Sequence, residues 1–312
     1  MAKQYEFIKA EQGSPEWLEL RKHGVGASDI PVILGMSKYK TPYELWAEKT
    51  GKVEPEPVGE AAERGHILED AVATFYEKRT SAKTRRSNGI CRLKEHPWAF
   101  CSLDRTIEGE DGLVEIKTST SRAWELDPVP DFVQAQVQYQ MLVTGAPWVD
   151  VAALLGSLTF RIERVYANQM EQAVIFNAAQ KFWEAVETDT PPAILGRDSD
   201  VFAKVVPQQR GDILQATPEI EMVAQAYADA TYEEDLSTEH LRNLAIEMKQ
   251  AIGDAEGIRG NGWSATWKQN KDKVSVDWKA VAMSIQVTDE IIKQHTTTEP
   301  GARVFRFKKQ EN

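Results

Sequence analysis

The stretch "CSLDRTIEGEDGLVEIKTST", residues 101–120, contains the pattern from which the fold can be inferred. Its segment VEIKT alternates branched apolar side chains with two opposite charges, Glu115 and Lys117. Because alternate residues of a strand point to the same face, the apolar side chains should face helices while Glu115 and Lys117 share the other face. The segment GEDG suits a hairpin turn, which would bring Asp104, from a preceding strand predicted at WAFCSLDRTIE (residues 98–108), close to that charged face.

Two carboxylates beside a lysine predict a site for a divalent cation. A buried charge is costly unless it is paired or binds a metal. Oxygen ligands suit Mg²⁺, so Asp104 and Glu115 are candidate ligands. Lys117 would orient or deprotonate an attacking water, or stabilise negative charge at phosphorus. The alternative is a solvated ion pair on an open sheet, worth about 0–1 kcal/mol. Glu247 and Lys249 show that E-x-K also occurs by chance.

Two helical segments supply further candidates for the same site. Residues 62–79 have helical spacing and place Glu69 on a helix just before the strands, where it could add a third carboxylate or be solvated. In FVQAQVQYQM, Gln136 and Gln140 share one helix face with Tyr139, and amides aimed at a metal site can position water or phosphate. The alternative is that these glutamines are simply exposed to solvent, as glutamines on helices commonly are.

Two other segments are candidates for binding the phosphates of a nucleic acid. LRKHGVGASD combines Arg21, a glycine turn and Ser28 at a helix start, where free N–H groups favour anions; an ordinary capped helix is the plain alternative. The densest basic stretch, EKRTSAKTRRSNG, either lines a path to the metals or is a solvated loop. Its candidate backbone-binding residues are Arg79, Lys83, Arg85 and Arg86.

Composition limits the class of protein. The 312 residues are 42% hydrophobic and 27% charged, which is enough to bury a core. The net charge of -11 argues against nonspecific coating of nucleic acid, so a nucleic-acid site would be a local basic groove. The two cysteines form no C-x-x-C motif, and no apolar run is long enough to cross a bilayer. We therefore expect a soluble cytoplasmic protein with no membrane partner.

The order of elements predicts an α/β fold with a central mixed β-sheet flanked by helices, followed by a smaller C-terminal α+β domain. A Pro-, Gly- and Asp-rich break ends the first domain, which we place at residues 1–206. Residues 207–312 should form the second, with a helical hairpin over 217–255 broken near residues 236–238. Short strands are expected at GWSATWK, KVSVDWK and RVFRFKK. The tryptophans there suit either core packing or base stacking.

Taken together, the ordered blocks EWLELRKHGVGASD, RGHILED, SLDRTIE, LVEIKTS and AQVQY resemble the YqaJ-like viral recombinase family of PD-(D/E)xK nucleases. The resemblance covers roughly residues 14–185. It implies a PD-(D/E)xK core and an exonuclease that uses Mg²⁺, with Mn²⁺ as a substitute. Such an enzyme degrades one strand of double-stranded DNA ends in the 5′ to 3′ direction. The resemblance also implies a single-strand annealing protein as partner, a ring-shaped homo-oligomer, and a phage or prophage gene in a bacterial host.

The resemblance also assigns roles to residues. Asp104 and Glu115, with the Ile116 carbonyl, match the metal ligands, and Lys117 matches the catalytic lysine. Glu69 matches a further acid near the metals and Gln136 the glutamine of the A-Q-V-Q-Y block. Arg21 and Ser28 match the positions that hold a terminal 5′-phosphate. Leu103 replaces the proline of the usual pattern, and residues 207–312 have no counterpart in the core of the family.

Two alternatives share the same core. The fold could be a non-catalytic DNA-end-binding scaffold for recombination, in which the acids only stabilise the sheet. It could also be a structure-specific endonuclease, which linear and closed circular DNA would distinguish from an exonuclease.

Overall fold

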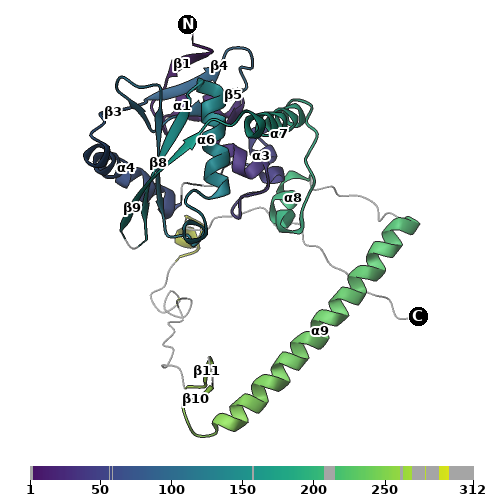
Figure 1. Cartoon of the computed structure of the whole chain (residues 1–312). Helices are drawn as coiled ribbons and strands as arrows, with labels where there is room; N and C mark the ends of the chain where they lie inside the picture. The colour runs from purple at the N-terminus through teal and green to yellow at the C-terminus, as the bar shows by residue number, and fades with distance from the viewer. Residues whose placement is uncertain are drawn as a thin grey trace. The chain divides into compact units, whose positions relative to one another are not determined.

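A computed structural model describes residues 3–55, 57, 59–156, 158–206, 215–260, 263–268, 278 and 288–294. The chain divides into two compact units, Met1–Pro207 and Gln208–Asn312. Figure 1 shows the elements of each. Among the described helices, none is both long and apolar enough to cross a bilayer.

The first unit contains a five-stranded mixed sheet in the order β3-β6-β7-β8-β9. Strand β7 pairs in parallel with β8, and the other neighbours are antiparallel. This sheet, with helices on both faces, confirms the predicted α/β class. Its strands are β3 (Thr84–Arg86), β6 (Arg105–Ile107), β7 (Leu113–Ser119), β8 (Trp148–Leu155) and β9 (Thr159–Tyr166).

A second sheet, in the order β1-β4-β5-β2, was not separated from the first in the sequence analysis. The segment 98–108, read there as one strand, divides at Leu103 and Asp104 into β5 and β6, which belong to different sheets. The division places Asp104 at the junction of the two sheets. The strands are β1 (Tyr5–Lys9), β2 (Val25–Gly26), β4 (Gly89–Leu93) and β5 (Ala99–Ser102).

Helices cover both faces of the five-stranded sheet (Figure 1). Val114 and Ile116 pack with Val72 and Tyr76 of helix α4 (Glu60–Thr80), as the alternation in β7 predicts. The other face packs against helix α6 (Asp131–Thr144), which ends at Gly145 with φ 77°. Helical spacing places Ile67, Val72, Phe75 and Tyr76 near one stripe of α4, but only Val72 and Tyr76 are buried. Ile67 and Phe75 are exposed, and the helix turns Glu69 inward instead.

The remaining helices of this unit complete the core around α6. Two of them begin at the caps that their sequences predict: Ser14 accepts a hydrogen bond from the Trp17 amide and Thr41 from the Glu44 amide. The helices are α1 (Pro15–Lys22), η1 (Ala27–Asp29), α2 (Ile30–Ile33), α3 (Pro42–Lys49), α5 (Ala123–Leu126), α7 (Gln169–Glu187), η2 (Gly196–Asp198) and α8 (Ser199–Val205).

The second unit corrects one prediction. Residues 217–255 do not form a helical hairpin: helix α9 (Pro218–Ile252) runs without a break. The expected break near 236–238 contains neither glycine nor proline, so the helix continues to Gly253, with φ 57°. It is followed by the antiparallel strands β10 (Gly257–Gly260) and β11 (Trp263–Thr266), while α11 (Asp289–Gln294) lies further along.

Some predictions for this unit lie outside the described residues. The strand expected at 303–309 is among them, as is the strand expected at 273–279 apart from Trp278. Of the tryptophans, Trp263 and Trp267 are about half exposed and not core residues. The Lys249 ammonium lies 5.7 Å from the Trp267 ring centre.

Candidate functional site

Strand β7 and the residue before β6 bring Asp104, Glu115 and Lys117 together. Strand β7 is antiparallel to β6, and Arg105, the first residue of β6, pairs with Val114, which directly precedes Glu115. The Ile116 amide donates a hydrogen bond to Asp104 Oδ2 at 2.7 Å. Lys117 Nζ donates to Glu115 Oε1 at 2.6 Å. Glu115 and Lys117 therefore share a face, and Asp104 is fixed to the strand that carries both.

Helix α6 completes the environment of Glu115. Gln136 Nε2 donates to Glu115 Oε1 at 2.7 Å, and Gln140 Nε2 donates to Glu115 Oε2 at 2.7 Å. Gln136 Oε1 also accepts from Lys117 Nζ at 3.0 Å. One turn of a helix thus supplies two amides, as the i, i+4 spacing predicts. The helical spacing had marked Gln140 as a candidate together with Gln136, whereas the family resemblance assigned a role only to Gln136.

The charges of the site are strongly coupled. Burial, and after it the neighbouring Glu115 carboxylate, raise the pKa of Asp104 to about 8. For Lys117, burial opposes protonation, but the Glu115 and Asp104 carboxylates outweigh it and raise the pKa of the ammonium. Two acids that repel each other beside a cavity are a site that a cation would stabilise.

A cavity of about 230 Å³, here called the carboxylate cavity, is lined by both acids and by Arg21 and Ser28. Arg21 and Ser28, the phosphate-binding candidates of the sequence, are here called the anion corner. Arg21 lies 3.1 Å from Ser28 Oγ and 3.2 Å from Asp29. Lys49 also pairs with Asp29, at 2.9 Å. No pattern in the sequence predicted either of these contacts with Asp29. The cavity is lined by Gln12, Trp17, Arg21, Ala27, Ser28, Ser102, Asp104, Glu115 and Gln136.

Two glycines allow the anion corner to approach β5 so closely. A Cβ on Gly24 would lie 2.2 Å from the Trp98 carbonyl oxygen. One on Gly26 would lie 2.9 Å from the Phe100 ring and 3.2 Å from an Arg21 nitrogen. The glycine turn of LRKHGVGASD therefore positions Arg21 and Ser28 at the carboxylate cavity.

Glu69 is not brought to this cavity. It is buried, but its carboxylate pairs with the buried guanidinium of Arg105 and, at 3.3 Å, with Arg86. Among the described residues, no three His, Cys, Asp or Glu side chains gather closely enough to hold a metal ion by themselves. The two carboxylates at the cavity fit a cation such as Mg²⁺, which takes one or two carboxylates and keeps several waters.

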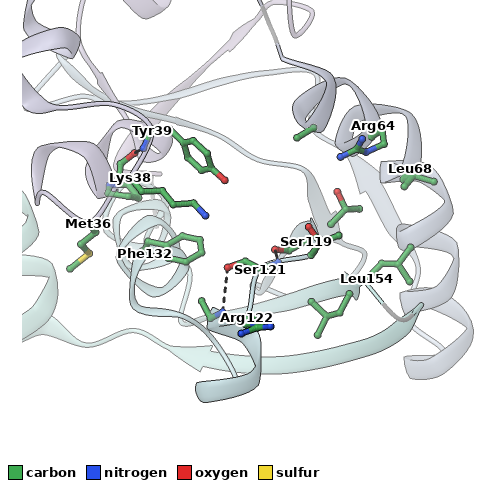
Figure 2. Close-up of a pocket in the computed structure, with 18 of the residues that line it drawn as sticks. Met36, Lys38, Tyr39, Arg64, Leu68, Ser119, Ser121, Arg122, Phe132 and Leu154 are labelled. Carbon is green, nitrogen blue, oxygen red and sulfur yellow. Dashed lines mark hydrogen bonds between the residues drawn. The ribbon is translucent and has the colours of Figure 1, made fainter. Parts of the chain in front are cut away.

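A larger cavity, here called the basic cavity, opens beyond the end of β7 and has a volume of about 960 Å³ (Figure 2). Residues 118–120, which follow Lys117 directly, form part of its wall. Figure 2 shows Lys38 and Tyr39 on one side and Arg64 on the other, with Arg122 beneath them. The strand that carries Lys117 thus leads into a basic, partly aromatic hollow.

The basic stretch of the sequence lies on and around β3, and its side chains are exposed. Arg85 pairs with Glu108 at 2.7 Å, and Arg86 with Asp70 at 3.0 Å. Their charges are therefore partly compensated within the protein. Arg79 and Lys83 are exposed as well.

Comparisons with known proteins show which family the chain belongs to. Residues 16–147 match the model of the YqaJ-like viral recombinase domain. The chain is 32% identical to the YqaJ protein of Bacillus subtilis (strain 168) over 273 residues, covering 83% of this chain and 84% of that protein. The chain belongs to the YqaJ-like viral recombinase family, which confirms the resemblance found in the sequence.

Solved structures of exonucleases are also similar to the chain. The alkaline exonuclease LHK-Exo of Laribacter hongkongensis matches 62% of this chain and 100% of its own, with 20% identity and a TM-score of 0.48. A phage-related exonuclease of Haemophilus somnus 129PT matches 53% of this chain and 96% of its own, with 15% identity and a TM-score of 0.41.

Proposed function

We propose that the protein is a divalent-metal-dependent deoxyribonuclease that digests double-stranded DNA from its ends. The observation that carries the proposal is the carboxylate cavity, where Asp104 and Glu115 share one space with Arg21 and Ser28. A pair of acids beside a lysine suits phosphodiester hydrolysis, and an arginine–serine corner suits a terminal phosphate. The family, which is one of viral recombinases, supports the same activity.

In this proposal Asp104 and Glu115, with the Ile116 carbonyl, hold Mg²⁺, for which Mn²⁺ can substitute. The bound metal would supply Lewis-acid activation of the scissile phosphate and of a water. Lys117, held between Glu115 and Gln136, orients the water or takes its proton and offsets negative charge at phosphorus. Gln136 and Gln140 hold the Glu115 carboxylate in place. Glu69 is proposed as a further acid, and in this role it would have to exchange its contact with Arg105.

The proposed direction of digestion is 5′ to 3′. Arg21 and Ser28 are the groups in the carboxylate cavity that can receive a terminal phosphate, and a guanidinium binds phosphate through several parallel hydrogen bonds. A 5′-phosphate there would present the adjacent phosphodiester to the acids. The product would be a 3′ single-stranded overhang, which suits a single-strand annealing protein as partner and a ring-shaped homo-oligomer that encloses DNA.

We propose that DNA also occupies the basic cavity. Its lysine and arginines offer phosphate contacts, and Tyr39, which is 85% exposed, offers a ring for stacking. A local basic hollow would allow a chain of net charge -11 to bind a polyanion, which supports the proposal. Further backbone contacts are proposed for Arg79, Lys83, Arg85 and Arg86. For these contacts Arg85 and Arg86 would exchange the acids with which they pair.

The deciding experiment is digestion of linear duplex with one 5′-phosphorylated end, with and without Mg²⁺, following both strands separately. Mononucleotide release from the 5′-phosphorylated strand, dependent on the metal, is the expected result. Retention of DNA without any release would favour a binding scaffold, and cutting of closed circular DNA would favour an endonuclease.

A further inference from the structure

Helix α9 carries a seam with heptad spacing. Positions that alternate three and four residues apart hold apolar or alanine side chains along nearly its whole length, with Glu234 and Ser237 at the centre. A mean spacing of about 3.5 residues is the pattern of a helix that pairs with another in a left-handed supercoil. The other members of the seam are Ile220, Val223, Tyr227, Ala230, Leu241, Leu244, Met248 and Ala251.

Large side chains of this seam are exposed to solvent. Val223 is 62% exposed, Leu241 64% and Leu244 41%, and of the residues in α9 only Ile252 is buried. Most helices in proteins owe their stability to packing of an apolar face and not to intrinsic propensity. A 35-residue helix with an exposed seam is therefore suited to a partner helix of similar length.

The order of side chains along the seam is complementary to the same order read in the opposite direction, as antiparallel pairing of two copies requires. In antiparallel pairing centred between residues 235 and 236, Ala230 lies opposite Leu241 of a second copy and Ile220 opposite Ala251, which combines large with small side chains. Val223 then lies opposite Met248. Apolar layers thus occupy both halves of the pairing.

The polar residues select this orientation. At the centre, each Glu234 lies opposite a Ser237 hydroxyl, which can donate a hydrogen bond to it. Beside the seam, each Glu233 lies opposite a His240. In a parallel pair, Glu234 would instead face the Glu234 of the second copy, and like charges in such a layer are destabilising.

We propose that α9 is an association surface whose partner is α9 of a second copy of this chain, in antiparallel orientation. The inference concerns the second unit and does not depend on the proposed nuclease activity. It adds a two-fold contact to whatever assembly the first unit forms.

The first test compares two substitutions in the same turn of α9 by light-scattering mass of the full-length protein. Leu244→Asp places a charge in the seam, while Ile246→Asp places the same charge on the opposite face, where Ile246 is 50% exposed. The expected result is a twofold fall in particle mass for Leu244→Asp and none for Ile246→Asp. An unchanged mass in Leu244→Asp overturns the proposal.

The second test fixes orientation in variants without added charge, using a short bis-maleimide. The double variant Val223→Cys with Met248→Cys should give cross-linked dimers, since these positions lie opposite each other between copies. Within one helix they are about 37 Å apart, too far for the reagent. Each single variant should remain uncross-linked, because the native Cys91 and Cys101 are buried. Absence of dimers in the double variant, or cross-linking of Val223→Cys alone, overturns the antiparallel pairing.

Discussion

The Ile116 amide and the Asp104 carboxylate are joined by a hydrogen bond of 2.7 Å. This contact ties an acid from the junction between two sheets to the strand that carries Glu115 and Lys117. The geometry of the candidate site therefore depends on β7 itself and not on a mobile surface loop.

Lys117→Ala should reduce release of nucleotides from linear duplex by at least about 100-fold, the usual scale for losing a proton-transfer or charge-stabilising group. DNA binding should change little, since the lysine faces Glu115 and Gln136 and not the basic cavity. Lys249→Ala is the matched control, because it alters the lysine of the second E-x-K. Wild-type digestion by Lys117→Ala would remove the lysine from the mechanism.

Arg21→Gln should abolish the preference of the enzyme for 5′-phosphorylated over 5′-hydroxyl ends. Among the described residues that line the carboxylate cavity, Arg21 carries the one positively charged side chain, and this side chain is placed to receive that phosphate. The measurement is the ratio of initial rates on the two substrates, with Lys181→Gln on α7 as control, since Lys181 lines neither cavity. If the wild-type protein already digests both ends equally, Arg21 and Ser28 lose this role.

Asp104→Asn should stabilise the protein at pH 8 without metal. The pKa of Asp104 is about 8 in the folded protein and about 4 in an unfolded chain. The folded state therefore binds more protons between these values, and the free energy of unfolding contributed by this group falls as pH rises through them. Replacing the carboxyl by a neutral amide removes that penalty, so the melting temperature at pH 8 should rise by at least about 2–4 °C.

Addition of Mg²⁺ should make the melting temperature of the wild type higher than that of Asp104→Asn. It should raise the melting temperature of the wild type, whose two acids gain a shared cation, and leave Asp104→Asn nearly unchanged. Asp127→Asn, at an exposed aspartate of the first unit, controls for net charge. A wild-type melting temperature that does not respond to Mg²⁺ would contradict the placement of the metal.

Arg105→Ala should destabilise the first unit by about 3–5 kcal/mol, because it leaves the buried Glu69 carboxylate without its main partner. Arg85→Ala, which breaks the exposed pair with Glu108, should cost about 0–1 kcal/mol. Urea unfolding at neutral pH measures both. Equal effects of the two substitutions would show that the buried pair contributes no more to the free energy of unfolding than the exposed pair.

Local patterns in the sequence predicted much of the fold and of the site. Alternation in VEIKT placed Glu115 and Lys117 on one face, and the glutamine spacing placed Gln136 on the helix above them. Contacts between distant segments were not predictable in this way. The partner of Glu69 is Arg105, 36 positions away, and nothing in helical or strand periodicity marks such a pairing.

The break between β5 and β6 was missed for a related reason. Residues 98–108 are uniformly strand-like, and only pairing partners decide that β5 joins β4 while β6 joins β7. In α9 the opposite error occurred. The Ser237-Thr238 pair suggested a break, but the heptad pattern on both sides continues through it.

The two-residue junction at Leu103 and Asp104 has a mechanical consequence. Arg21 and Ser28, the residues proposed to hold the end phosphate, flank β2 of one sheet, whereas Glu115 and Lys117 lie on β7 of the other. In the proposed nuclease, the angle between the two sheets would therefore set the distance between the bound end phosphate and the phosphodiester that is cut. In a nuclease of this design, the angle between the two sheets, and not any single side chain, would set the number of nucleotides removed in each cleavage.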